Sequence, residues 1–143
     1  MKALLKLFAV IAVIYLGLKC FDGRLSNIIP PSNSSSDVTR AFESHRSGVQ
    51  VSGEGTVTRL LPDDNRGSRH QKFILRLSTN QTLLVSHNID LAPRISSLSI
   101  GDKVEFYGVY EWNSKGGLVH WTHHDPKRSH TGGWLKKNGR KYQ

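Results

Sequence analysis

Alternating apolar and polar positions dominate the chain after residue 48, and they predict a series of short, half-buried strands. In such a strand the side chains at every second position share one face, so each apolar set would turn towards a common core. Residues with turn propensity, such as Thr79-Asn80, separate the alternating runs. The runs cover residues 49–61, 71–77, 82–87, 103–112 and 118–123. The pattern predicts a mainly β domain.

One segment between the third and fourth runs has helical spacing instead. Leu91, Ile95 and Leu98 lie at positions i, i+4 and i+7, and Asp90 precedes them as a candidate N-cap. Three strands, a short helix and two more strands follow the order of an OB fold. We therefore expect a small five-stranded OB-like barrel over residues 49–126. An unrelated small β-barrel with the same number of strands is the alternative.

The N-terminal segment, residues 1–20, is almost continuously apolar. Lys2 and Lys6 precede an uninterrupted apolar run from Leu7 to Leu18, which is the layout of a signal peptide. No A-x-A pattern of small residues follows, so a hydrophobic helix retained as a signal anchor is favoured over a cleaved signal peptide. The segment predicts a location in the bacterial cell envelope. The protein would be anchored in the inner membrane and face the periplasm, or be secreted to the periplasm if the segment is cleaved.

Two polar segments flank the predicted barrel. Residues 21–48 contain Pro30, Pro31 and a Ser-rich run, which predict a flexible linker. Residues 127–143 are basic and contain no acidic residue. They predict a basic C-terminal tail, part of which packs back on the barrel through Trp134, Leu135 and Tyr142.

The charge balance favours a polyanionic partner. The chain has 20 Lys and Arg residues against 11 Asp and Glu residues, a formal net charge of +9. Such a surface attracts nucleic acid or an acidic glycan, although charge alone does not choose between them. The single cysteine excludes an intrachain disulfide bond. The residues predicted to bind the ligand are positively charged or aromatic: Arg69, Lys72, Arg76, Trp112, Trp121, Lys127 and Arg128.

Histidines concentrate at the end of the predicted last strand, in the sequence HWTHHDP over residues 120–126. Strand alternation would put His120, Thr122 and His124 on one face. His120, His124 and Asp125 are then candidate ligands of a divalent metal ion. Together with His70 they are also the candidate catalytic residues. The spacing matches no strong zinc signature, so hydrogen-bonding histidines at the rim of a barrel are the alternative.

The loop DDNRGSRHQ, residues 63–71, is a second candidate for chemistry. Its acidic residues suit either a cation site or an ordinary turn, and the turn is favoured. Arg69 and His70 follow them and would face a phosphate at the rim of the barrel. The sequence has neither a G-x-S-x-G motif nor a glycine-rich phosphate loop.

Four stretches carry a resemblance to a known family: GTVTRLLPDDNRGSRHQKFILRL, TLLVSHNIDLAPRI, GDKVEFYGVYEWN and KGGLVHWTHHDP. Together they cover roughly residues 53–134. They resemble an uncharacterised family of short bacterial envelope proteins, domain of unknown function 3465. The resemblance implies the same delivery to the envelope and a compact domain. It implies no activity, cofactor or catalytic residue.

Three functions are compatible with these features, and whether the protein is an enzyme stays open. The first is an OB-like module that binds a polyanionic ligand, either nucleic acid or an acidic glycan. The second is a metal-assisted hydrolase, such as a phosphodiesterase or nuclease, that uses the histidines around Asp125. The third is an accessory subunit of an envelope protein complex. Charge and fold together favour the binding module.

Overall fold

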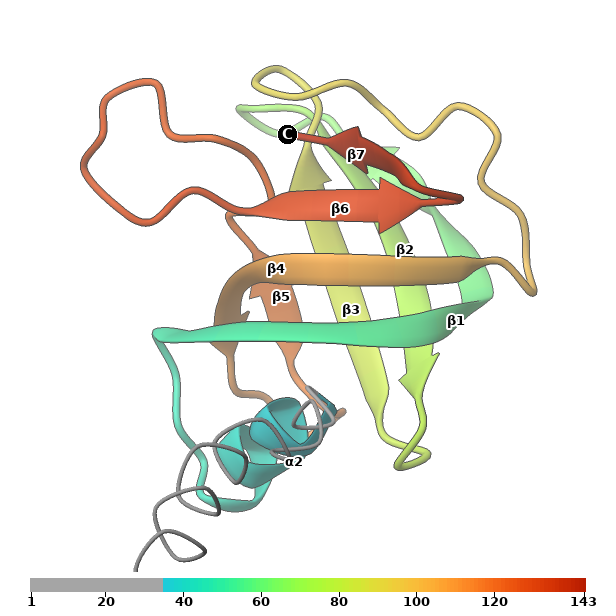
Figure 1. Ribbon diagram of the computed structural model, residues 1–143, viewed down its shortest axis with the longest axis vertical. Coiled ribbons are helices and arrows are strands. Elements are labelled where there is room, and N and C mark those ends of the chain that lie inside the picture. Colours follow the sequence, from blue (N-terminus) through green and yellow to red (C-terminus); the bar gives the residue numbers. More distant parts are fainter. Residues whose placement is uncertain (1–34) are drawn as a thin grey trace, which may run out of the picture. The chain divides into compact units, whose positions relative to one another are not determined.

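The alternating runs form strands that close into a ring, shown in Figure 1. The computed structural model describes residues 35–143. Within that range one helix precedes seven strands. The elements are α2 (Ser35–Glu43), β1 (Val49–Asp64), β2 (His70–Leu77), β3 (Thr82–Asn88), β4 (Lys103–Glu111), β5 (Leu118–His120), β6 (Trp134–Lys137) and β7 (Arg140–Tyr142). The prediction of a mainly β protein is confirmed.

Strand β1 closes the ring because it pairs with two neighbours. Its first half runs antiparallel to β4, with Val49 opposite Tyr110, and its second half runs antiparallel to β2. Strands β2 and β3 form an antiparallel hairpin, β3 pairs in parallel with β5, and β5 returns antiparallel to β4. The hydrogen-bonded order around the ring is therefore β1-β2-β3-β5-β4 and back to β1.

The inward positions of the ring form the hydrophobic core. Phe73, Leu75, Val85 and Phe106 are fully buried, and their neighbours along each strand are more exposed, as alternation requires. Gly53 makes room for this packing, since a Cβ atom there would lie 2.6 Å from the ring of Phe106. The apolar face recognised in the sequence is thus the face that the ring encloses.

The predicted helix between the third and fourth strands is wrong. Residues 89–102 form turns and irregular backbone in place of a helix. Pro93 has no N–H to donate and disfavours helical geometry in the residue before it. Ile95 is fully buried, but its backbone is satisfied by a side chain: its N–H donates to Gln71 Oε1 at 2.9 Å, and its C=O accepts from Gln71 Nε2 at 3.0 Å. Gln71 therefore takes over the bonding that a helix would have supplied.

A helix occurs instead inside the range predicted as a flexible linker. Val38 and Ala41 of α2 are buried and belong to the hydrophobic core cluster, and Phe42 packs against it. Their spacing of three and four residues gives the helix one apolar side, which contacts β1. None of the described helices is long and apolar enough to cross a membrane. The predicted hydrophobic helix of residues 1–20 lies outside the described residues.

The predicted C-terminal tail adds a hairpin to the ring. Strand β6 pairs with β4, and β7 pairs with β6. Asn138 and Gly139 connect them with positive φ values of 49° and 77°, which suit a two-residue hairpin turn. Leu135 is fully buried and Tyr142 nearly so. The expectation that part of this segment packs on the domain is confirmed for Leu135 and Tyr142, whereas Trp134 is half-buried.

Candidate functional site

The outward positions of β2, β3 and β5 form one continuous surface, which we call the β2–β3–β5 face. Paired residues of neighbouring strands point to the same side of a sheet, so the register defines the surface. Its rows across the hairpin are Arg76 and Thr82, Ile74 and Leu84, Lys72 and Ser86, and His70 and Asn88. Strand β5 continues it, with Leu118 beside Leu84 and His120 one position beyond the Val85–Val119 pair. The face combines basic, apolar and imidazole side chains.

An irregularity in β1 adds Arg59 to this face. The register of β1 against β2 shifts between Val57 and Arg59, so that Arg59 lies opposite Ile74. Lys72 and Arg76 are each two residues from Ile74 on the same side of β2. Diagonal neighbours of this kind lie within reach of long side chains. Three cationic side chains therefore surround Ile74.

Most acidic side chains of the described residues are already paired with basic ones. Glu43 is the exception among the Asp and Glu residues of residues 35–143. The pairs are Arg40–Asp37, Arg69–Asp90, Lys72–Asp64, Arg94–Asp63, Lys103–Glu54, Lys136–Glu105, Lys137–Asp102, His120–Glu111 and His130–Asp125. Arg59 and Arg76 contact no carboxylate within the same range. Two of the basic side chains without a carboxylate partner in the described residues, Arg59 and Arg76, thus lie on the β2–β3–β5 face.

Two pockets open along the face, one near each end. The first, of about 230 Å³, lies between the β2–β3 hairpin and the β4–β5 turn, and its lining includes Ile74, Leu84 and Lys115. The second, of about 100 Å³, lies at the other end. We call it the Trp121 pocket; its lining residues are His70, Ser86, Asn88, His120, Trp121 and His123. Four of these six side chains are aromatic rings.

The backbone at Trp121 ends the strand alternation predicted for this segment. Trp121 has a φ of 52°, in the left-handed region that bulky residues rarely adopt. After this reversal Thr122 is fully buried and His124 is exposed, whereas His120 lies on the β2–β3–β5 face. The predicted common face of His120, Thr122 and His124 is therefore wrong. Strain of this kind persists where the surroundings over-determine it, often at functional sites.

His87 lies in the core directly beneath this end of the face. Its Nε2 is 3.2 Å from the carbonyl oxygen of Pro93, and its Nδ1 is 2.9 Å from Thr122 Oγ1. Since a carbonyl only accepts, Nε2 carries the proton and Nδ1 accepts from the Thr122 hydroxyl. Burial lowers the pKa of His87 to about 4, against hydrogen bonds that work in the other direction. His87 is a neutral structural group at neutral pH.

The carboxylate of Asp125 closes the loop that follows. Its oxygens accept hydrogen bonds from the backbone N–H groups of Lys127 and His130, both at 2.9 Å, and from the N–H and hydroxyl of Ser129. Desolvation works to raise the pKa of Asp125, but these hydrogen bonds hold it far below its ordinary value. Asp125 is a negatively charged loop-closing group whose acceptor positions are largely occupied.

The predicted metal-binding set is not assembled. Within residues 35–143, no group of three or more His, Cys, Asp or Glu side chains is arranged to hold a metal ion. His124 is exposed, and Asp125 is engaged with its own loop. Of the four candidate catalytic residues, only His70 and His120 line a common pocket.

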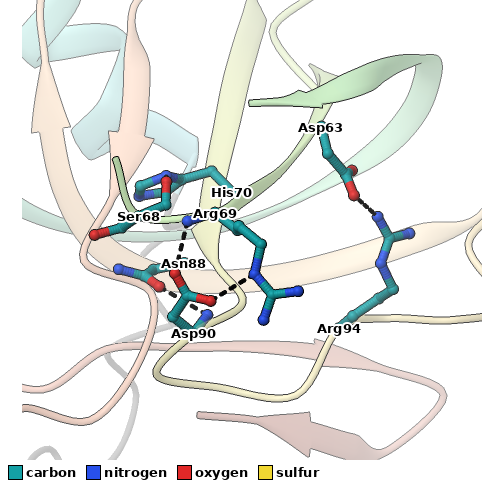
Figure 2. A network of polar contacts seen from close by, with 7 residues as sticks. All are labelled: Asp63, Ser68, Arg69, His70, Asn88, Asp90 and Arg94. Atoms are coloured by element: carbon teal, nitrogen blue, oxygen red, sulfur yellow. Dashed lines mark hydrogen bonds and ion pairs between the residues drawn. The ribbon is translucent and has the colours of Figure 1, made fainter. Parts of the chain in front are cut away.

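Charged side chains of the loop before β2 are paired with residues of the segment that follows β3, as Figure 2 shows for Asp63 and Arg69. Asp90 accepts from both the backbone N–H and Nε of Arg69 at 2.7 Å, and these two hydrogen bonds lower the pKa of Asp90. Asp63 pairs with Arg94. His70 Nδ1 donates to the carbonyl of Ser68 at 2.8 Å, which fixes its ring at the rim of the Trp121 pocket. Arg69 is thus held by Asp90.

The remaining predicted ligand-binding residues differ in availability. Arg76 is exposed on the β2–β3–β5 face, and Lys127 and Arg128 are exposed on the loop after Asp125. Trp112 packs against the core and lies 4.4 Å from the ring of His45, measured between centroids. Sequence reasoning missed Arg59, because its place on the face depends on the irregularity in β1. It also missed Ser86 and Asn88, whose outward alternation was the available signal.

The fold places the protein among the mainly β proteins. Its ring of five strands carries an outer face with basic side chains and two pockets. The chain belongs to the family described as "Protein of unknown function (DUF3465)", whose family model matches residues 25–143. Membership of the family that the sequence resembles is thereby confirmed, while the location in a bacterial envelope stays a prediction. No curated protein sequence matches the chain significantly.

Proposed function

We propose that this protein is a binding module for a polyanionic ligand, either a nucleic acid or an acidic glycan. We further propose that its ring of strands is a barrel of the OB type. In that fold the face of strands 2 and 3, with the loops between strands 1 and 2 and strands 4 and 5, binds oligonucleotides or oligosaccharides. Both pockets on the β2–β3–β5 face border these elements, which supports the proposal.

The observation that carries the proposal is the arrangement of Arg59, Lys72 and Arg76 around Ile74. Arg59 and Arg76 contact no carboxylate within residues 35–143, and Lys72 makes only a 3.6 Å contact with a partly exposed Asp64. Guanidinium groups bind phosphate and carboxylate oxygens with two parallel hydrogen bonds. Two such groups beside an apolar strip suit a polymer that alternates charged and less polar parts.

We also propose that the module works in the bacterial cell envelope. The apolar segment of residues 1–20, with Lys2 and Lys6 before its uninterrupted run, supports delivery through or into a membrane. Retention of this segment as an anchor would hold the module beside the inner membrane, facing the periplasm. Cleavage would release the same module into that compartment.

Binding measurements on the purified full chain test the function. The probes are a labelled single-stranded oligonucleotide and labelled heparin, each titrated by fluorescence anisotropy at several salt concentrations. The double variant Arg59→Gln/Arg76→Gln should bind at least one probe about tenfold or more weakly than the wild type, with a salt slope smaller by about 1.4 for the single-stranded DNA. Both effects follow from losing two contacts to the ligand's charges.

A matched control variant distinguishes the loss of specific contacts on the β2–β3–β5 face from a general effect of lower net charge. The variant Arg40→Gln/Arg46→Gln removes the same two charges from α2 and the turn that follows it, away from the proposed face. It should bind nearly as well as the wild type. Equal losses in the two double variants, or a wild type that binds neither probe in a salt-dependent way, would refute the proposed function.

A further inference from the structure

We infer that the Trp121 pocket is a stacking subsite for one base of a single-stranded nucleic acid. This inference rests on the proposed function and narrows its ligand to nucleic acid. The pocket lies on the same face as the basic side chains, since Lys72 pairs with Ser86 and His70 with Asn88. From Arg76 to His70 the strand advances about 20 Å, which a strand of a few nucleotides can follow.

The indole ring of Trp121 is partly exposed at the pocket. Trp121 is 39% exposed, although a tryptophan normally contributes its large apolar surface to a core. Its ring centroid lies 3.8 Å from that of His130, in an edge-to-face arrangement, and 5.5 Å from that of His123. The two imidazole rings therefore pack against the indole of Trp121, and part of the indole surface is left for another ring.

The backbone that carries Trp121 is held rigidly by its neighbours. A Cβ atom on Gly133 would lie 2.0 Å from the carbonyl oxygen of Trp121, so the backbone of residue 133 packs directly against the left-handed turn. The N–H of Gly133 also donates to the carbonyl oxygen of His123 at 2.7 Å. Asp125 closes the loop between these segments. A ring held before binding loses little conformational freedom when a ligand stacks on it.

The residues that line the Trp121 pocket favour a nucleic-acid base over a charged sugar. The Trp121 pocket has aromatic walls and contains no Lys or Arg among its lining residues. An acidic glycan carries its charges on the sugar rings themselves, whereas a nucleic acid carries them on phosphates between flat, uncharged bases. Basic side chains along the strands and an aromatic pocket beyond them match the second arrangement.

One polar side chain at the pocket can meet the edge of such a base, whereas Nε2 of His120 is buried and lies 3.4 Å from a carboxylate oxygen of Glu111. Ser86 contributes a hydroxyl that both donates and accepts. Base edges present donors and acceptors of these kinds.

The test uses three probes on the purified full chain: an oligothymidine of about eight nucleotides, within the range that OB folds cover, an abasic strand of the same length and charge, and heparin. The wild type should bind the oligothymidine about tenfold more tightly than the abasic strand. Trp121→Ala should remove that difference without changing the affinity for the abasic strand. Trp121→Phe, which keeps a stacking ring, should lose at most about threefold.

Two controls accompany these variants. Trp134→Phe changes a tryptophan that packs beside Tyr107 on the β4–β6 pair and should leave all three affinities unchanged. Thermal melting of each variant shows that the fold is retained. If Trp121→Ala does not fold, Trp121→Leu takes its place, because it keeps an apolar side chain without a stacking ring and should likewise remove the preference for the oligothymidine.

The possible failures are distinguishable. If the wild type binds both strands equally, prefers heparin, or loses affinity for both strands equally on Trp121→Ala, the base subsite is refuted. The proposed function survives that result if Arg59→Gln/Arg76→Gln still weakens binding selectively. If that double variant changes nothing, the proposed function itself falls.

Discussion

Acidification should destabilise the protein because the buried ring of His87 is harder to protonate in the folded state than in the unfolded chain. Its ring is fully buried, and its pKa is lowered from 6.5 to about 4. In the unfolded chain the imidazole takes up a proton near its ordinary pKa, so between these values the unfolded state binds more protons. The stability that depends on the neutral ring is therefore fully present above about pH 6.5 and is lost progressively as the pH falls towards about 4.

The loss follows from the two pKa values. From about pH 7 to about pH 4.5, the linkage integral for a shift from 6.5 to about 4 amounts to about 2 kcal/mol. His123 contributes in the same direction, because burial lowers its pKa as well. The carboxylates of Asp90 and Asp102 have pKa values lowered from 3.8, so their stabilisation is lost only at still lower pH. The chosen window therefore isolates the histidines.

Urea denaturation of the full chain, followed by circular dichroism at the two pH values, measures the effect. The variant His87→Gln keeps an amide for hydrogen bonding and cannot titrate. It should be less stable than the wild type at about pH 7 but should lose less stability on acidification, by about 2 kcal/mol. An equal loss in both proteins would show that His87 is not the group responsible, and the reasoning from its burial would be refuted.

Two further substitutions test a buried hydrogen-bond pair and a close contact within the ring of strands. Gln71→Leu should lower the free energy of unfolding by about 2 to 4 kcal/mol, because the buried N–H and C=O of Ile95 lose their partners; faster hydrogen exchange at the Ile95 amide checks the cause. Gly117→Ala should cost more than about 2 kcal/mol in the same assay, because its φ is 98° and its Cβ would lie 2.2 Å from the ring of Tyr110. Gly67→Ala is the control, since its φ is also positive but no atom lies within 4 Å; it should cost only about 1 kcal/mol. Equal costs at the two glycines would contradict the packing argument.

The strands were predictable because their signal is local. Phe73, Leu75 and Leu77 alternate with polar neighbours, and burial alternates in the same way. The N-terminal bound of β4 was also predicted, and β5 proved shorter than its alternating run because Trp121 reverses the backbone. That reversal depends on packing against Gly133, which is remote in the sequence.

Helices were harder to predict because they depend on contacts elsewhere in the chain. The spacing of Leu91, Ile95 and Leu98 indicated a helix, but Gln71 binds the backbone of Ile95 and Pro93 disfavours helical geometry. Conversely, α2 was not predicted because its surroundings in the sequence are polar. Its apolar side is stabilised by the core, in which Val38 is buried. Intrinsic preference is a weak signal when tertiary partners intervene.

The candidate site was predicted in part. Residue types indicated a basic surface with aromatic groups, and Arg76, Lys72 and Trp121 do lie on or beside one face. The predicted convergence of His120, His124 and Asp125 does not occur among the described residues, because the loop after β5 places the three side chains in different surroundings. Arg59 required knowledge of the strand register, which no local pattern contains.

The double pairing of β1 also constrains how the protein is made. Its first half pairs with β4, which begins only at Lys103, and the parallel partner of β3 is not complete until His120. A nascent chain that has emerged only as far as the β2–β3 hairpin therefore exposes hydrogen-bonding edges on both sides of a three-stranded meander. Such edges invite aggregation until they are covered. Ring closure is consequently a late event of biosynthesis, and chains truncated before β5 should depend on chaperones for their solubility.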